Sequence, residues 1–482
     1  MSSVWPILSP ALTFLGFQSV SWLSYIHPDE FFQSFQPLLN DNVPWEFVHA
    51  CRSVVPLKLI QFILSLSKPP YTASIYLIVK MVYFGASYFA VYFSINSLLP
   101  SLQHRQTALV IVSTSYITYV YQSHTFSNSL ETTLLLPTVV IVDGMRNNRS
   151  SVAKSFVLGL LVALGVFNRV TFVSWLLVPS VFALKYFLNH WGHLLAALTS
   201  LIAFSSIFIA IDSEYFAGSA KTLVITPLNS LLYNTKISNL AQHGLHPYYQ
   251  HVLVNYPLIL GPLVLTAFPF NTEHIKSTPF IAMVSGVLVH SLVPHQELRF
   301  LVPMVPLWAC CAKFSKAQLF KFPYILWIPF NTAMLVFMGK FHQGGVVPAM
   351  FELQNYTENL VFWRTYKPPT WIIHNRDRQF ANKDDPMFWD TIKTIKSPFL
   401  VDCMGLEYQG FESAVQQLLS ANEHLLLVAP QNAMLNVQNK TIQYREIWSY
   451  PWHYDMDHFE FETYGWSTFK PGIGIFNVTA YL

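Results

Sequence analysis

The feature that most constrains the fold is a succession of apolar segments, each close to the length of a membrane-spanning helix. A helix needs about 20 apolar residues to cross a bilayer, and such segments recur up to about residue 340. Only 11% of the 482 residues are charged, whereas a soluble domain carries about 25%. We therefore predict a polytopic α-helical membrane protein with about eleven spans. The expected spans are 4–26, 73–97, 107–122, 129–143, 155–168, 170–187, 194–212, 252–270, 279–294, 299–312 and 322–339.

Short basic loops predict the orientation of these spans. Three clusters of basic residues fall on one side, which the positive-inside rule makes cytoplasmic. Because the number of spans is odd, the N-terminus is expected in the cytoplasm and the C-terminal tail in the lumen. The clusters are His104 with Arg105, Arg146 with Arg149 and Lys154, and Lys313 with Lys316 and Lys321.

The segment 42–68 is too polar to be another span. Its second half, 54–66, carries Leu57, Ile60 and Leu64 at helical spacing. This pattern favours a helix that lies in the membrane interface.

The composition changes at about residue 340, where charged residues and Asn become frequent. We predict a transmembrane catalytic domain with lumenal loops over 1–339 and a lumenal domain over 340–482, which is within the usual size of a domain. The segments 397–401, 410–419 and 425–429 have the patterns of a strand, a helix and a strand. The tail is therefore expected to be a small α/β domain.

Two kinds of covalent modification depend on this topology. Asn148 begins an N-x-S/T sequon but lies in a predicted cytoplasmic loop, so it should stay unmodified. Cys51 and Cys403 are both predicted to be lumenal and form either a disulfide or two free thiols, because sequence does not supply their distance. The sequons of the tail are glycosylation candidates: Asn355, Asn439 and Asn477.

Two adjacent acidic residues, Asp29 and Glu30, follow the first apolar segment within the stretch Tyr25–Ser34. Pro28 suits the first turn of a helix, and acidic residues suit the positive end of the helix dipole. An ordinary helix start is therefore one interpretation. The other is a catalytic base at the membrane face, because an apolar surrounding can tune the pKa of a carboxylate for proton abstraction.

The other predicted lumenal loops also carry ionisable groups, which are costly at membrane depth and are functional candidates. Each has a structural alternative; Glu297 and Arg299, for example, would also make an ion pair. Together they suit transfer from a lipid-phosphate donor, since Arg and protonated His hold phosphate and a carboxylate takes the proton of an attacking hydroxyl. The loop residues are His27, Asp29, Glu30, His124, Asn128, Glu131, Asn168, Arg169, His243, His246, His251, His295, Glu297 and Arg299.

Several other functions are disfavoured by composition and motif. The net charge of +3 is too small to indicate nucleic-acid binding. The four cysteines form no CxxC pair, so no metal knuckle is expected. A Gly-rich phosphate loop of the Rossmann type is absent from the sequence, which argues against a soluble nucleotide-sugar enzyme.

Four ordered blocks resemble the multi-spanning mannosyltransferases of the GT-C class that use dolichyl-phosphate mannose, namely glycosyltransferase family 22, whose members act on GPI and N-glycan precursors. The resemblance covers about residues 20–310, and His453–His458 is similar to a late motif of the family. The four blocks are His27–Gln33, Phe126–Thr132, Thr226–Pro247 and Pro294–Pro303.

This resemblance implies an enzyme of the endoplasmic reticulum membrane with a lumenal active site. The blocks favour the branch that adds the fourth mannose, α-1,2-linked, to a trimannosyl GPI precursor by one inverting displacement. The expected partners are the lipid-linked donor and the GPI glycolipid acceptor, with no obligate protein partner. We expect no metal and no cofactor.

The resemblance also implies roles for single residues. Asp29 is expected to be the general base, with Glu30 as its support or as the alternative base. The expected donor-phosphate residues are Arg169, His295 and Arg299, and the expected acceptor-side residues are His27, Asn234, His243 and His246.

Two alternatives remain open at this point. A sibling enzyme of the family would add the third GPI mannose or a mannose of the N-glycan precursor. A polytopic lipid transporter or scramblase would also contain broken helices and buried ionisable residues, although no inverted repeat relates the two halves of the chain.

Overall fold

The computed structural model describes residues 22–39, 43–69, 71–266, 275–311, 322–373, 378–437, 442–456 and 458–480. These residues form two compact units. The first unit is built on Val43–Met334, and the second joins Ser21–Asn42 to Leu335–Leu482.

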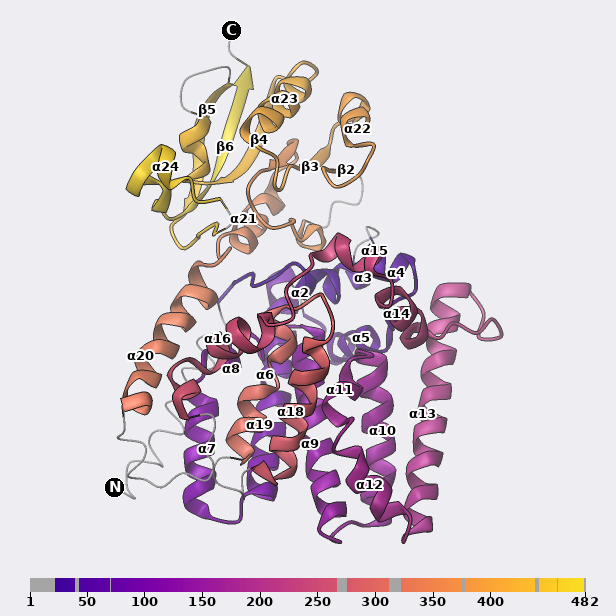
Figure 1. Ribbon diagram of the computed structural model, residues 1–482. Coiled ribbons are helices and arrows are strands. Elements are labelled where there is room, and N and C mark those ends of the chain that lie inside the picture. The colour runs from indigo at the N-terminus through magenta and orange to yellow at the C-terminus, as the bar shows by residue number, and fades with distance from the viewer. Residues whose placement is uncertain are drawn as a thin grey trace. The chain divides into compact units, whose positions relative to one another are not determined.

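The first unit is helical (Figure 1). Two of its described helices, α6 and α13, are long and apolar enough to cross a membrane, and several shorter apolar helices accompany them. Its elements are α4 (Trp45–Val48), α5 (Val55–Ser67), α6 (Thr72–Leu98), α7 (Leu102–Thr114), α8 (Tyr116–Val120), α9 (Ser127–Arg146), α10 (Val152–Asn168), α11 (Phe172–Leu176), α12 (Ser180–Phe187), α13 (Trp191–Ala217), α14 (Thr226–Asn234), α15 (Ile237–Leu240), η1 (Ala241–His243), η2 (Gln250–Asn255), α16 (Tyr256–Leu260), η3 (Gly261–Thr266), α18 (Thr278–Ser291), η4 (Leu298–Leu301), α19 (Met304–Cys311) and α20 (Phe322–Val336), which continues into the second unit.

Several predicted spans are interrupted in the structure. The span predicted at 107–122 is divided at Ser115, whose backbone is extended. The span predicted at 170–187 is divided into α11 and α12, and Pro179 at this break lacks the N–H that a continuous helix would use. The segment 252–270 begins as a π-helix and continues as short helical pieces up to Thr266.

Residues 4–21 of the first predicted span, 4–26, lie outside the described residues. Lys313, Lys316 and Lys321 lie outside them as well. The described end of that span, 22–26, is not helical, so its predicted boundary was wrong. The interfacial segment 54–66 is a helix as predicted, and α5 buries Leu57 and Ile60.

Side-chain contacts show which helix ends of the first unit lie together. At one end, Arg146 of α9 bonds to the Lys276 carbonyl and to Thr278 at the start of α18. At the other end, Asn168 of α10 donates to the Ser127 carbonyl at the start of α9 (2.7 Å). The Asn168–Ser127 contact therefore lies at the end of α9 that is opposite the basic α9–α10 connection (Figure 1).

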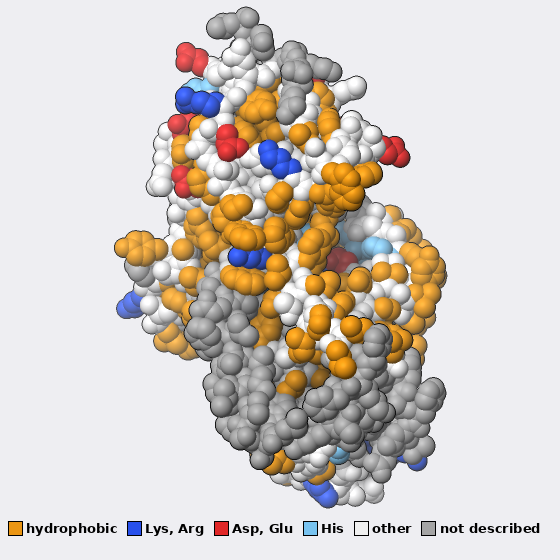
Figure 2. Space-filling view, turned by 90° about the vertical axis from the view of Figure 1, so that its left-hand side faces the viewer, with side chains coloured by type: hydrophobic (Ala, Val, Ile, Leu, Met, Phe, Trp, Pro, Cys, Tyr) orange, Lys and Arg blue, Asp and Glu red, His pale blue; other side chains and the backbone are white. Residues whose placement is uncertain are grey.

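Apolar side chains also cover much of the outer surface. On α13, for example, Leu195 is 63% and Ile202 is 64% exposed. Figure 2 shows one face of the molecule, on which hydrophobic side chains gather in broad patches and charged side chains are few. Such a surface is costly in water and is expected for helices that face lipid.

The second unit is an α/β domain around a six-stranded sheet in the order β2-β3-β1-β4-β6-β5. The strands β2, β3, β1 and β4 are parallel, and β6 runs antiparallel to β4 and β5. The predicted strand, helix and strand are confirmed by β3, α23 and β4. The elements are α2 (Asp29–Phe32), α3 (Phe35–Leu39), η6 (Phe337–Phe341), α21 (Val346–Glu352), η7 (Leu353–Asn355), β1 (Leu360–Phe362), η8 (Thr370–Ile372), β2 (Gln379–Asn382), α22 (Phe388–Thr394), β3 (Phe399–Asp402), α23 (Tyr408–Leu419), β4 (His424–Pro430), η9 (Ala433–Val437), β5 (Ile442–Tyr450), α24 (Phe461–Tyr464), η10 (Gly465–Phe469) and β6 (Ile473–Ala480).

The cysteines follow one of the two alternatives left open by the sequence. Cys51 and Cys403 are both free thiols. Cys403 is fully buried in the apolar core between the sheet and its helices, where it behaves as a small hydrophobic residue.

The division of the chain differs from the predicted boundary at 339/340 in one respect: the stretch with the acidic pair packs within the second unit. The Tyr25 hydroxyl donates to the Lys367 carbonyl (2.7 Å), and Phe35 stacks on Trp371 with ring centroids 4.7 Å apart. The buried Gln36 amide donates to Thr370 Oγ1 (2.7 Å) and accepts from the Trp371 N–H (3.2 Å). These contacts have no local sequence signature, which is why the sequence assigned this stretch to the first domain.

Gln36→Ala tests this anchoring. Removing a buried amide leaves its partners without hydrogen bonds, which costs about 1–3 kcal/mol. We expect a lower thermal unfolding midpoint in detergent. Gln61→Ala is the control, because Gln61 is exposed on α5 and contacts only Lys58 among the described polar contacts. Equal midpoints for the two variants would contradict the anchoring.

Candidate active site

The acidic pair occupies the first turn of α2, and Pro28 is its N-cap. The Asp29 side chain is 29% exposed and accepts a hydrogen bond from Gln33 Nε2 (2.5 Å), while its backbone N–H donates to His27 Nδ1 (3.2 Å). Glu30 is fully buried. Of the two carboxylates, Asp29 is therefore the one that a substrate can reach.

An aromatic residue of the second unit packs behind this turn. The ring of Tyr366 lies 5.7 Å from that of Tyr25 and 6.3 Å from that of His27. Its hydroxyl is hydrogen-bonded to His342 Nε2 (3.1 Å), and His342 is almost fully buried. The residues just before Pro28 are thus held from one side by Tyr366.

The late motif noted in the sequence reaches the same place through Gln343. This buried residue has a φ of +48°, which is strained for a side chain other than glycine. The side-chain oxygen Oε1 of Gln343 accepts a hydrogen bond from the backbone N–H of Tyr366 (3.1 Å). The side-chain nitrogen Nε2 contacts Asp455 Oδ1 (3.5 Å). Asp455 also pairs with His458 (2.6 Å). The late motif therefore supports the His27–Asp29 turn rather than lying apart from it.

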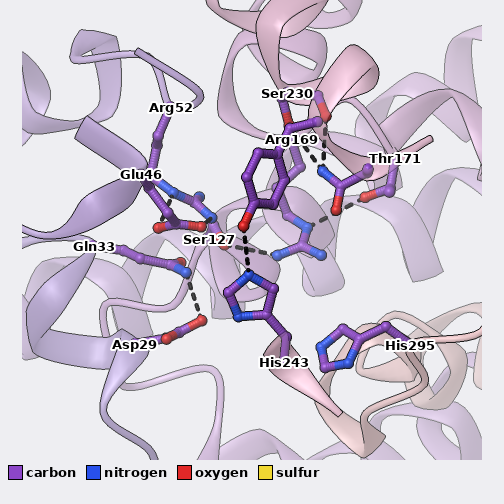
Figure 3. A network of polar contacts seen from close by, with 12 residues as sticks. Asp29, Gln33, Glu46, Arg52, Ser127, Arg169, Thr171, Ser230, His243 and His295 are labelled. Atoms are coloured by element: carbon purple, nitrogen blue, oxygen red, sulfur yellow. Dashed lines mark hydrogen bonds and ion pairs between the residues drawn. The ribbon is translucent and has the colours of Figure 1, made fainter. Parts of the chain in front are cut away.

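In the first unit, Arg169 follows the end of α10 and approaches the buried Glu131 of α9, with Nε and Oε2 3.6 Å apart. It also donates to Ser127 Oγ (3.0 Å) and to Thr171 Oγ1 (3.3 Å) (Figure 3). Its guanidinium lies over the ring of Phe300 at 4.9 Å. This set of contacts fixes the direction of a cation that is almost fully enclosed.

A second arginine reaches the same aromatic ring. Arg299 of η4 lies 5.6 Å from the centre of Phe300 and donates to both oxygens of Glu297. His295 Nε2 pairs with Glu297 Oε1 at 2.8 Å, and its Nδ1 contacts the Gly244 carbonyl (2.9 Å). Two of the predicted donor residues, Arg169 and Arg299, therefore meet on one ring, with His295 beside them.

A third pair was missed by the sequence argument, in which Arg52 lay only within the polar segment 42–68 and carried no role. Arg52 donates to both oxygens of Glu46 at 2.8 Å (Figure 3). Burial lowers the pKa of Arg169, and the charges of Arg52 and Arg299 lower it further. The carboxylates of Glu131 and Glu46 act in the opposite direction and raise this pKa. Arg52 and Arg299 thus lie close enough for their charges to act on Arg169, and each of the three arginines has its own carboxylate.

Two of the histidines predicted for the acceptor side, His243 and His246, lie beside this cluster, whereas His27 belongs to the second unit. The rings of His243 and His246 are 6.2 and 5.9 Å from that of His295, and His243 is hydrogen-bonded to the Tyr233 hydroxyl (3.1 Å). Asn234 does not join them: it is exposed, and its amide turns back to the Ser230 carbonyl of its own helix (2.8 Å).

The charges of this cluster suit an anion. Guanidinium groups recognise phosphate with paired, charge-assisted hydrogen bonds. Burial by itself lowers the pKa of His295, but the hydrogen bond and charge of Glu297, together with the Gly244 carbonyl, outweigh it, so this pKa lies above its ordinary value. His295 therefore carries positive charge to a higher pH than a solvated histidine. The expectation of a metal-free site stays a prediction.

Comparison with known proteins identifies the family. The model of the Alg9-like mannosyltransferase family matches residues 8–374. The chain belongs to this family. It is therefore a glycosyltransferase, and the transporter alternative is set aside.

The curated relatives extend over nearly the whole chain. GPI mannosyltransferase 4 of Candida albicans is 35% identical over 94% of this chain and 95% of its own length. GPI mannosyltransferase 4 of Debaryomyces hansenii is 37% identical, with the same coverage, and that of Saccharomyces cerevisiae is 32% identical, also with the same coverage.

Solved structures support the fold. ArnT from Cupriavidus metallidurans in the apo state aligns over 98% of both chains with a TM-score of 0.58 at 8% identity. Its complex with undecaprenyl phosphate aligns over 99% of this chain and 98% of that chain with a TM-score of 0.56 at 9% identity. The predicted fold class, a helical membrane glycosyltransferase of the GT-C type, is confirmed at this level.

The raised pKa of His295 predicts a pH dependence. A group whose pKa is raised keeps its charge at low pH and loses it as the pH rises through that pKa. If His295 helps to hold a phosphate, the KM for the lipid-phosphate donor should increase several-fold above neutral pH, and His295→Gln should flatten this rise. The measurement is the donor KM between pH 6 and 8.5.

The control is His193→Gln, because His193 contacts Ser155 at the start of α10, at the opposite end of the first unit. This variant should keep the wild-type pH dependence. An unchanged pH dependence in His295→Gln would show that His295 does not bind the donor phosphate.

Proposed function

We propose that this chain transfers mannose from dolichyl-phosphate mannose to a GPI precursor and adds the fourth, α-1,2-linked mannose to the trimannosyl glycolipid. The observation that carries the donor class is the convergence of Arg52, Arg169 and Arg299, each paired with a carboxylate, at one end of the first unit. The relatives named GPI mannosyltransferase 4 support the acceptor. The ArnT structure with undecaprenyl phosphate shows that this fold accommodates a lipid phosphate.

In the proposed reaction the acceptor hydroxyl attacks C1 of the donor mannose. A bond forms between the acceptor oxygen and C1 while the bond from C1 to the phosphate oxygen breaks. Arg169, Arg299 and His295 stabilise the negative charge that the leaving dolichyl phosphate gains. Asp29 takes the proton of the hydroxyl. One displacement turns a β-linked donor into an α-linked product, so the reaction needs no covalent enzyme intermediate. That it also needs no metal or cofactor stays a prediction.

Exposure distinguishes the two candidate bases. A general base must come within hydrogen-bond reach of the proton that it removes. Asp29 is partly exposed, whereas Glu30 is buried behind it. We therefore assign the base to Asp29 and a supporting role in the turn to Glu30.

The first experiment supplies labelled dolichyl-phosphate mannose and a trimannosyl GPI precursor to membranes that contain equal amounts of each variant. Wild type should form a tetramannosyl product, and Asp29→Asn should lower kcat by about 10²- to 10⁴-fold because the base is lost. Glu30→Gln, if it accumulates to the same level, should lower kcat by less than about tenfold.

Other outcomes would change the proposal in defined ways. An inactive but folded Glu30→Gln beside an active Asp29→Asn would make Glu30 the base. Wild type that elongates only a shorter GPI or an N-glycan precursor would keep the family and reject the fourth-mannose assignment in favour of the sibling enzyme.

The proposed location is the endoplasmic reticulum membrane, with the N-terminus in the cytoplasm and the second unit in the lumen. The sequon at Asn355 is exposed in η7. Asn477 lies inside β6, between β4 and β5, and is half-buried. Asn439 lies outside the described residues.

Glycosidase treatment tests this orientation. We expect Asn355 to be glycosylated, so that Asn355→Gln removes a glycosidase-sensitive mass shift on a gel. Asn148→Gln should change nothing, because Asn148 is exposed between α9 and α10, which is the predicted cytoplasmic side. A glycan on Asn148 would reverse the proposed topology.

A further inference from the structure

An aromatic stack lies beside the arginine cluster in the first unit, and nothing in the proposed chemistry uses it. The indole of Trp45 stacks on the ring of Tyr233 at 4.6 Å and on the ring of His243 at 4.8 Å. These three rings come from α4, α14 and η1, so three separate segments of the chain build the stack. We call Trp45, Tyr233 and His243 the aromatic platform.

Both partner rings lie on the same face of the indole. The centroids of Tyr233 and His243 are 6.0 Å apart, and the two side chains are hydrogen-bonded to each other. A sandwich with Trp45 in the middle would separate them by nearly the sum of the two stacking distances. Tyr233 and His243 therefore leave the opposite face of the indole to other contacts or to solvent, and Trp45 as a whole is 38% exposed.

The platform is held in place before any ligand arrives. The buried Asp212 of α13 accepts hydrogen bonds from the Val54 N–H (2.9 Å) and from Thr226 Oγ1 (2.6 Å). These bonds join the segment that follows α4, the helix of Trp45, to the start of α14, the helix of Tyr233. Asn229 of α14 also donates to the Ala50 carbonyl (3.1 Å). An exposed indole fixed in this way loses little entropy on binding.

Charged groups flank the platform on the side of the arginines. Glu46 is the next residue after Trp45 and pairs with Arg52. The charge of Arg52 in turn acts on Arg169. Aromatic rings with a few fixed polar groups are typical of sites for small ligands. A pyranose ring matches both features, because its axial C–H groups carry partial positive charge and suit the negative face of an aromatic ring, while its hydroxyls suit carboxylate and guanidinium.

We propose that the exposed face of Trp45 stacks on a mannose ring of the acceptor glycan and sets which hydroxyl meets the donor. This rests on the proposed function. Trp45 would contact the acceptor and not the donor, since the donor is held at its phosphate by the arginines. A glycan of several linked sugars extends away from its reacting end, and the platform would bind one of the sugars that is not modified.

The test is a kinetic comparison of Trp45→Ala, Trp45→Phe and wild type with labelled dolichyl-phosphate mannose and the trimannosyl GPI precursor. Loss of one aromatic contact should raise the acceptor KM about tenfold in Trp45→Ala, with the donor KM unchanged. Trp45→Phe keeps a ring on Tyr233 and should restore most of the acceptor affinity. A soluble mannotriose should compete with the acceptor for wild type and weakly for Trp45→Ala.

Trp389→Ala is the matched control, because Trp389 is exposed to a similar degree (44%) but lies on α22 of the second unit. It should leave both KM values as in wild type. If Trp45→Ala misfolds, Trp45→Leu takes its place in both measurements, because leucine keeps an apolar side chain but offers no ring to the sugar.

Three results would overturn the inference. These are an unchanged acceptor KM in folded Trp45→Ala, a rise confined to the donor KM, and mannotriose competition that is equal in wild type and variant. Wild type that transfers no mannose to this acceptor would instead refute the proposed function, so the two failures are distinguishable.

Discussion

The candidate site depends on the pairing of each enclosed guanidinium with a carboxylate of its own. An unpaired buried charge is strongly destabilising, and the charges of Arg52 and Arg299 also act unfavourably on the charged Arg169. Glu46, Glu131 and Glu297 offset both costs, and each comes from a segment close to the arginine that it serves or from a helix packed beside it. The cations can then be held near lipid without losing their charge or their direction.

This pairing also bears on catalysis. A site that stabilises a leaving phosphate works best when its donors are already oriented, since reorganisation during the reaction costs energy. Phe300 contributes by lying under both Arg169 and Arg299. The carboxylates thus fix the orientation of the guanidiniums before a substrate arrives.

The second unit contributes in a different manner. Its sheet is an ordinary α/β arrangement, yet the turn with Asp29 belongs to it through Tyr25, Gln36 and Tyr366. Gln343, with its strained backbone, joins that support to the late motif at Asp455. This explains how a motif more than 400 residues from the acidic pair can affect it: residues of the tail pack against the turn and hold it in place.

The sequence by itself determined the class of the protein, because long apolar segments with few charges can be buried only in a membrane, and it also determined the strand–helix–strand core of the tail, because these patterns are local. Ionisable residues beside apolar spans supplied the candidates, and the family resemblance singled out Asp29, Arg169, His295 and Arg299 among them. Only the tertiary structure separated the partly exposed Asp29 from the buried Glu30, brought Arg52 to Arg169, turned the Asn234 amide back to its own helix and stacked Trp45 on Tyr233. Most of these depend on contacts between residues distant in the chain, and such contacts leave no periodicity in the sequence. The break in the span predicted at 107–122 has the same origin, since the Asn331 side chain accepts a hydrogen bond from the Tyr116 N–H just after Ser115.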